Sequence, residues 1–287
     1  MSARQSNLDE YHRRVRLVQE HIARHLEEPP DLVSLARLAH FSPFHFHRIF
    51  RGVTGMPLFA YTRALRLERA AAALSGGDDS ILTIAIRAGY DSHEAFTRAF
   101  RDQFGITPTQ HRRGQSANPP KPIPAGAFTM NVQVVNVDPI LVASVRHVGP
   151  YGSPTIKDTW SSLCRWAAPK GLLNQTTKCY GIGHDDPEAT PPEKIRYDAC
   201  ITVPADTKGE GDVVIQTIKG GRCAKTTHLG PYEKLAETYG ALFAQWLPSS
   251  GQEPADAPPF EHYVNTPDST SPDKLITDIY IPLSASK

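Results

Sequence analysis

The sequence predicts two domains: an all-α N-terminal domain with two tandem helix-turn-helix units, and an α+β C-terminal domain of two pseudo-symmetric strand-strand-helix-strand-strand repeats. Three observations support this prediction. A helical pattern occurs twice within residues 1–116, fifty residues apart. A different pattern, centred on Gly-Pro-Tyr, occurs twice in the rest of the chain, 81 residues apart. A proline-rich stretch separates the two pairs, and such internal repetition indicates repeated structural units.

An amphipathic helix is predicted close to the N-terminus. Tyr11, Val15, Val18 and Ile22 fall on one face of an Arg-rich helical pattern. The segment lacks the continuous apolar run of a signal peptide. We therefore expect a cytoplasmic protein with no membrane association.

The first duplicated pattern predicts two helix-turn-helix units. Residues 42–51 in unit one and 92–101 in unit two share Ser, Phe, Arg, Phe and Arg at matching places. Each copy predicts a short helix, a turn, and a second helix that opens on a cap at Ser42 or Ser92. Two adjacent units of this kind predict a protein that contacts DNA twice.

The second helix of each unit has one apolar face and one face suited to base edges. Phe46, Ile49 and Phe50 fall at i, i+3 and i+4, and unit two repeats this stripe, so both stripes are predicted to be core. On the other face, Arg can bond guanine, Thr and Phe can pack on thymine methyl groups, and Glu can accept from cytosine. A merely solvated face is the alternative, and the duplication favours DNA reading. The candidate DNA-reading residues are Phe44, His47, Arg48, His93, Glu94, Thr97 and Arg98.

Charge and composition divide the chain at one place. Residues 1–116 contain 16 Arg, no Lys and 12 acidic residues, a net charge of +4, whereas the remainder carries −3. A basic N-terminal half suits phosphate contacts. Residues 117–126 include four Pro and are predicted to form a semi-rigid linker between domains that share little apolar surface. The predicted domains are therefore 1–116 and 127–287.

The second duplication predicts the α+β domain. A strand leads into Gly-Pro-Tyr at 149–151 and another into Gly-Pro-Tyr at 230–232. An amphipathic helix and two further strands are expected after each motif. The expected helices span 155–166 and 232–247, and the expected strands include 130–137, 140–148, 178–184, 196–203, 260–265 and 275–281.

Residues 8–114, with Phe-Gly-Ile-Thr-Pro at 104–108, resemble the DNA-binding domain of AraC-type transcription regulators. The resemblance implies two helix-turn-helix units bridged by one long helix, expected over 57–74, and double-stranded DNA as the partner. Carried over by position, the family's base readers fall on the seven candidates named above. Where relatives often have Trp or Gln, this chain has Phe, His and Glu, so their recognised DNA sequences do not transfer to it.

Residues 127–287 resemble the GyrI-like (Rob-like) effector-binding domain, through motifs at 181–187, 196–200, 228–232, 260–263 and 277–282. The resemblance implies an acidic residue at the base of an aromatic cleft that receives bulky or cationic compounds. Glu261 best matches this acid and shares a strand face with Tyr263. A solvated or Arg-paired strand-edge carboxylate is the alternative. The remaining ligand-binding candidates are Asp278 and Tyr280, expected to repeat the arrangement on the last strand, and the lining residues His184 and Trp160.

The sequence leaves three functions open. The predicted one is a ligand-responsive bacterial transcription regulator with no cofactor, metal or catalytic residue. The alternatives are a GyrI-like hydrolase of reactive small molecules, with Glu261 as general base, and a module that binds gyrase or RNA polymerase. Four cysteines without a CxxC pair predict reduced thiols rather than a zinc site or disulfides.

Overall fold

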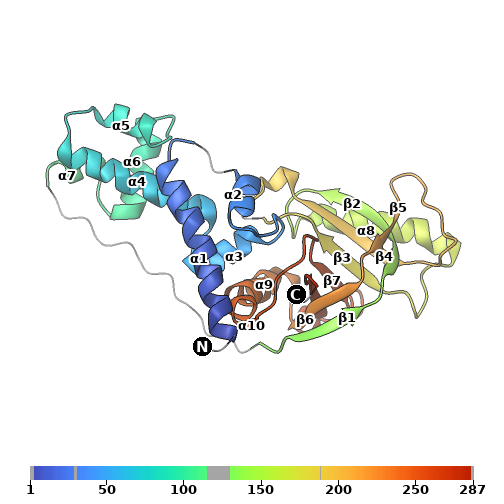
Figure 1. Ribbon diagram of the computed structural model, residues 1–287. Helices are drawn as coiled ribbons and strands as arrows, with labels where there is room; N and C mark the ends of the chain where they lie inside the picture. Colours follow the sequence, from blue (N-terminus) through green and yellow to red (C-terminus); the bar gives the residue numbers. More distant parts are fainter. Residues whose placement is uncertain (1–2, 29–30, 115–129, 188, 286–287) are drawn as a thin grey trace.

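The computed structural model describes residues 3–28, 31–114, 130–187 and 189–285. The predicted linker at 117–126 lies outside these residues. Figure 1 shows a helical N-terminal half and a strand-rich C-terminal half, as the sequence predicts. None of the helices in the described part of the chain is long and apolar enough to span a membrane.

Seven helices form the part of the N-terminal half that the structure describes. The predicted bridge is α4, and it separates unit one (α2 and α3) from unit two (α5 and α6), with the latter at the end of the molecule away from the sheet (Figure 1). At about 1.5 Å per residue, a 19-residue helix is roughly 28 Å long, close to one turn of duplex. The bounds are α1 (Ala3–Arg24), α2 (Leu32–Leu38), α3 (Phe46–Thr54), α4 (Leu58–Gly76), α5 (Ile81–Arg87), α6 (His93–Phe104) and α7 (Pro108–Arg112).

The two predicted serine caps, Ser42 and Ser92, differ in what they cap. Ser92 accepts a hydrogen bond from the backbone of Ala95 and caps α6, as predicted. In unit one α3 begins only at Phe46, and its cap position makes no side-chain hydrogen bond. The hydroxyl of Ser42 accepts a hydrogen bond from the backbone of Phe44 at 3.3 Å, in the turn before α3, and donates to Asp256 of the C-terminal half at 2.9 Å. Ser42 therefore caps the turn that leads into α3 rather than α3 itself, because α3 begins at Phe46.

In the described residues of the C-terminal half, eight strands form one antiparallel sheet in the order β1-β6-β8-β7-β3-β4-β2-β5. The first strand of each repeat crosses to the other repeat, because β1 pairs with β6 and β5 pairs with β2. The two repeats meet where β3 pairs with β7, in the middle of the sheet. The strands are β1 (Gln133–Val137), β2 (Ile140–Val148), β3 (Cys179–Gly183), β4 (Arg196–Thr202), β5 (Val214–Ile218), β6 (Gly221–Leu229), β7 (Phe260–Tyr263) and β8 (Ile276–Pro282).

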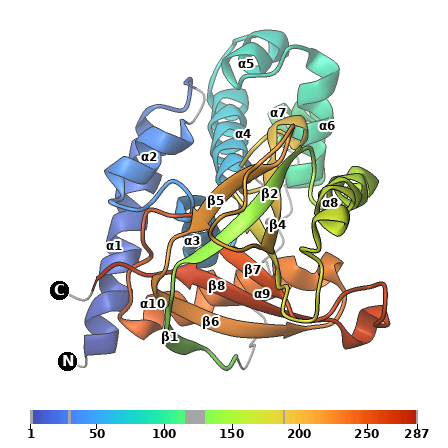
Figure 2. The same ribbon diagram turned by 90° about the vertical axis from the view of Figure 1, so that its right-hand side faces the viewer.

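Helices of both repeats cover the sheet. In Figure 2, α8 lies to the right of the strands and α1 to the left, and both pack on the face of the sheet that carries Ala199 and Ile279. The helix of the second repeat contains a π-helical segment, η4, a departure from α-helix that is frequent at functional sites. The bounds are α8 (Pro154–Ala167), η1 (Ala168–Lys170), η2 (Pro192–Lys194), η3 (Tyr232–Lys234), α9 (Leu235–Ala241), η4 (Leu242–Trp246), α10 (Leu247–Ser250) and η5 (Pro272–Lys274).

One hydrophobic core joins unit one to the C-terminal half. The predicted apolar face of α1, including the fully buried Tyr11 and Val15, packs in the same cluster as Phe50 of α3, Phe243 of η4 and Ile279 of β8. Unit two has a separate core around Phe96, Phe100 and Leu67. The expectation that the two domains share little apolar surface is therefore wrong for unit one.

Candidate DNA-reading and ligand-binding sites

The reading face of unit two is open to solvent. His93, Glu94 and Arg98 are exposed on α6, and Thr97 beside them is partly exposed. The opposite stripe is buried in the core of unit two, with Phe96 and Phe100 fully buried. A helix held from behind with polar side chains in front has the arrangement that major-groove reading requires.

The reading face of unit one is covered by the C-terminal half. His47 is buried, and its Nδ1 lies 3.3 Å from Oδ2 of Asp186, while Nε of Arg48 lies 3.5 Å from the same oxygen. Phe44, the third candidate in this unit, is partly buried. Asp186 belongs to the loop after β3, and this loop covers the face of α3 that carries His47 and Arg48. The expectation of an accessible reading face is therefore wrong for this unit.

Aromatic rings of the second repeat complete this contact. The guanidinium carbon of Arg48 lies 4.7 Å from the ring centroid of Tyr239 and 5.5 Å from that of Phe243. His45 stacks on Phe243 with ring centroids 5.3 Å apart. A desolvated cation over an aromatic face is a favourable contact, so these rings hold α3 against α9 and η4.

The backbones of α3 and η4 also approach closely at a glycine. A Cβ atom added to Gly52 would lie 2.6 Å from Cα of Ala244, which is closer than real side chains allow. The matching position of unit two, fifty residues on, is Asp102, which is exposed. Gly52 therefore permits the close packing of α3 against η4. Any residue with a side chain at this position would force the two helices apart.

Glu261 lies at the seam between the two repeats. Its strand partner across the seam is Gly181 of β3. Tyr263 donates a hydrogen bond to Oε2 of Glu261 at 2.7 Å, and Tyr239 donates to Oε1 at 3.0 Å. Tyr197 continues the chain, with its hydroxyl 2.9 Å from that of Tyr263. Glu261 as a whole residue has intermediate exposure, while the two tyrosines donate to both oxygens of its carboxylate.

Burial and charge act in opposite directions on this carboxylate. Burial raises the pKa of Glu261, whereas the bonds from Tyr263 and Tyr239 and the positive charge of Arg48 lower it. Burial also raises the pKa of the Tyr263 and Tyr239 hydroxyls far above the ordinary tyrosine value, so both stay protonated and donate. A bound cation would favour the ionised form of Glu261 for the same reason that Arg48 does.

More aromatic side chains surround Glu261. The rings of Trp160 and Tyr232 meet that of Tyr263 edge to face, at 5.9 and 5.3 Å between centroids. Gly181 makes room for Tyr263 and Tyr197, because a Cβ atom there would lie 2.3 Å from the Tyr263 hydroxyl and 2.8 Å from that of Tyr197. Together, Glu261, Tyr197, Tyr239, Tyr263, Tyr232 and Trp160 form what we call the Glu261 cluster.

Three predicted ligand residues lie apart from this cluster. In the register of β7 and β8, Asp278 pairs with His262 and Tyr280 with Phe260, whereas Glu261 pairs with Ile279. Directly paired residues share a face, so Asp278 and Tyr280 point to the opposite side of the sheet. The expected repetition of the Glu261 arrangement is therefore wrong, since a one-residue shift in register exchanges faces.

His184 also belongs to another network. Its Nε2 lies 2.8 Å from Oδ2 of Asp198, which Arg146 holds through two hydrogen bonds of 2.7 and 2.8 Å. These partners lower the pKa of Asp198 far below its ordinary range, although burial opposes them. The geometry is that of a structural ion-pair network, and it does not bring His184 to Glu261.

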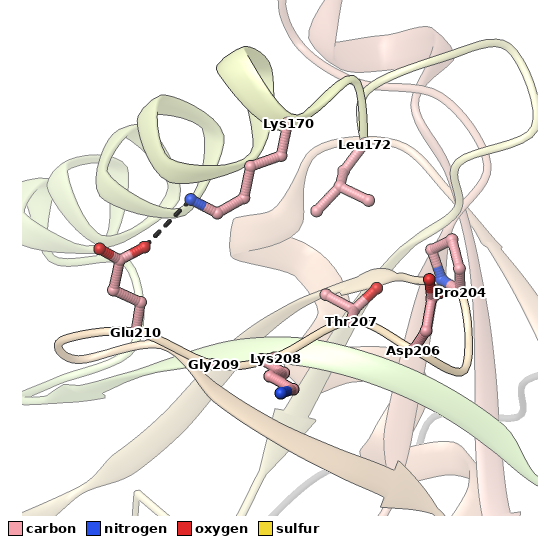
Figure 3. A pocket seen from close by; sticks show the side chains of 8 residues that line it. All are labelled: Lys170, Leu172, Pro204, Asp206, Thr207, Lys208, Gly209 and Glu210. Atoms are coloured by element: carbon pink, nitrogen blue, oxygen red, sulfur yellow. Dashed lines mark hydrogen bonds and ion pairs between the residues drawn. The ribbon is translucent and has the colours of Figure 1, made fainter.

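Two cavities lie away from the Glu261 cluster. The larger, of about 560 Å³, is shown in Figure 3, where Lys170 and Glu210 among its lining residues form an ion pair at 3.0 Å. A smaller one, of about 180 Å³, lies among Phe59, Arg63 and Tyr90 in the helical half. Within the described residues, no group of three or more His, Cys, Asp or Glu side chains is placed to hold a metal ion.

Sequence reasoning missed the residues that link the two halves. Tyr239 falls within a predicted amphipathic helix, and no pattern marks it as a partner of Glu261. The only available signal at Gly52 was a glycine inside a helical pattern, which often has a packing reason. The contact of Arg48 with Tyr239 joins positions 191 residues apart and is a product of the tertiary fold.

Comparison with known proteins agrees with both halves. Residues 130–284 match the GyrI-like small molecule binding domain, and residues 35–114 match a helix-turn-helix domain. The probable transcriptional regulator YgiV of Escherichia coli K12 is 30% identical over 162 residues, which cover 55% of this chain and 98% of YgiV.

Two further relatives resemble the N-terminal half. The right origin-binding protein of Escherichia coli K12 is 40% identical over 109 residues, 37% of this chain and 38% of that protein. The transcriptional regulator Rob of Salmonella typhimurium is 44% identical over 89 residues, 31% of each. The chain belongs to the family of GyrI-like small-molecule-binding domains, here preceded by an AraC-type helix-turn-helix domain.

Proposed function

We propose that the Glu261 cluster is the effector site of a transcription regulator and that its ligand is a lipophilic cation. The observation that carries this proposal is the position of Glu261 between two tyrosine hydroxyls at the seam of the repeats. Ring faces attract positive charge, and a desolvated carboxylate strengthens the ion pair. The tandem units bind double-stranded DNA, with Arg98 of unit two among the base readers.

Calorimetric titration of the full chain tests the ligand class. We expect benzylguanidinium to bind and the neutral, shape-matched benzylurea to bind more weakly. Glu261→Gln should make the binding free energy of benzylguanidinium less favourable by about 1.5–3 kcal/mol, the usual contribution of a hydrogen bond to a charged group. Asp278→Asn is the matched control, because it removes a carboxylate from the neighbouring strand on the opposite face. Equal affinity for both compounds, unchanged in Glu261→Gln, would exclude the cation site.

We propose binding without turnover. The probable transcriptional regulator YgiV matches the GyrI-like half over almost its whole length, which supports a regulator rather than an enzyme. Incubation of the chain with reactive esters and epoxides, followed by mass spectrometry of the products, separates the two activities. Catalytic hydrolysis that disappears in Glu261→Gln would favour the hydrolase alternative.

A further inference from the structure

Arg48 belongs to two sites at once. By position in unit one it is a base reader, and in the structure its guanidinium lies over the ring of Tyr239. The hydroxyl of the same tyrosine donates to Glu261, and the charge of Arg48 acts on the Glu261 pKa. An internal guanidinium thus already uses one aromatic face of the cluster that attracts cations.

Docking and DNA reading exclude each other for α3. The contacts of His47 and Arg48 with Asp186 use the face that would enter the major groove. The side chain of Arg48 is only 15% exposed and that of Asp186 only 8%, so no base edge can reach them in this arrangement. Asp186 and Glu261 would also repel the phosphates of a duplex placed there.

We propose that Arg48 is a built-in competitor of the effector: a cationic ligand takes the Tyr239 face, displaces Arg48 and releases α3 to read its half of the DNA site. The proposal rests on the proposed function, since it assigns the ligand to the Glu261 cluster. It adds that the effector resembles a guanidinium and that unit one, rather than unit two, is the responsive unit.

Competition of this kind couples the two ligands. Suppose that the cation binds more tightly to the form in which α3 is released. The cation then raises the affinity of the chain for DNA that engages both units, and this DNA raises the affinity of the chain for the cation by the same factor. Coupling factors of this kind are typically about 5 to 150. For DNA that carries only the half-site of unit two, the factor by which DNA and the cation raise each other's affinity should be near one.

A wedge variant breaks the docking without altering a reading or cluster residue. Ala244 of η4 faces Gly52 at backbone contact distance, so Ala244→Leu would push α3 away. Ser249→Leu is the matched control, because it adds the same side chain at an exposed position of the adjoining α10. Asp186→Asn is a second, milder variant that weakens the partner of Arg48 and leaves the packing unchanged.

The test measures benzylguanidinium and DNA binding by the full chain, with duplexes obtained by in vitro selection. In the wild type and in Ser249→Leu, we expect each ligand to raise the affinity of the other about 5- to 150-fold. In Ala244→Leu, the affinity for benzylguanidinium alone and the affinity for DNA alone should both exceed those of the wild type. The factor by which one ligand raises the affinity of the other should fall to near one. Asp186→Asn should lie between them.

The outcomes separate this proposal from the proposed function. One outcome is that benzylguanidinium binding depends on Glu261 but has the same affinity with DNA, without DNA and in Ala244→Leu. This result would overturn the competition with Arg48 and would still support the effector site. Absence of benzylguanidinium binding in every variant would exclude the cation site. Unchanged affinity of Ala244→Leu for the two-half-site duplex would overturn the docking claim without any ligand.

Discussion

Units one and two place their reading helices in very different surroundings. Helix α6 presents Arg98 to solvent, whereas α3 holds Arg48 over Tyr239 in the C-terminal half. Phe46 and Phe50 of the first core recur as Phe96 and Phe100, whereas Gly52 at the docking surface is matched by Asp102. The duplicated motif therefore places one reading helix in solvent and the other against the GyrI-like half.

The largest expected effect comes from removing the ring that supports the docking. Phe243 is fully buried and contacts His45 and Arg48, so Phe243→Ala should cost about 3–5 kcal/mol of unfolding free energy. Hydrogen exchange should accelerate in α3 and α9 and not in α6. Phe100→Ala is the matched variant in unit two and should accelerate exchange in α6 alone. A uniform change across both units would contradict the separation of their cores.

The two reading arginines should differ in their effect on DNA binding. Arg98→Ala should weaken specific binding by about 1–3 kcal/mol, the value of a bidentate base contact. Arg48→Ala should cost less in the absence of effector, because it also weakens the docked form that competes with DNA. Gel-shift titrations at fixed salt measure both. Equal losses would show that unit one is as accessible as unit two.

Acid should weaken the docked unit through His45. Burial, with a contribution from Arg48, lowers the pKa of His45 to about 3, whereas an unfolded histidine has a pKa near 6.5. Between these values the unfolded chain binds a proton that the folded chain excludes, so stability falls as pH drops below about 6.5. The loss from this residue should be about 1.4 kcal/mol between pH 7.5 and 5.5.

Urea unfolding at the two pH values checks this effect. His45→Phe keeps a ring against Phe243 and removes the titrating group. The wild type should therefore lose about 1.4 kcal/mol more than His45→Phe over this range. An identical pH dependence in both proteins would show that His45 does not carry the effect.

The smallest expected effect compares the turns of the two units. His40 has a left-handed φ of 52°, and its counterpart in unit two is Gly89 with φ of 83°. A non-glycine residue in this region costs about 1–2 kcal/mol, and part of this is offset because glycine loses more entropy on folding. We expect His40→Gly to stabilise the chain by up to about 1 kcal/mol in thermal unfolding. Destabilisation would mean that the His40 side chain makes a contact that outweighs the strain.

Much of the fold followed from local pattern. The spacing of Phe96 and Phe100 predicted the core of unit two, and the predicted strand at 140–148 has the bounds of β2. The site followed less well, because sheet register cannot be derived from alternation within one strand. Asp278 alternates like Glu261, yet pairing places it on the other face. Likewise, the helical face that carries Arg48 suits a base edge and a tyrosine ring equally, and only tertiary packing decides between them.

The accessibility of Arg48 tests the central claim most directly. Modification of the full chain by phenylglyoxal, mapped by mass spectrometry, compares Arg48 with Arg98 in one sample. If unit one is docked, Arg98 should react as a solvent-exposed arginine does while Arg48 is protected, and the protection should disappear in Ala244→Leu and persist in Ser249→Leu. Equal reactivity of Arg48 and Arg98 in the wild-type chain would contradict the docking of unit one.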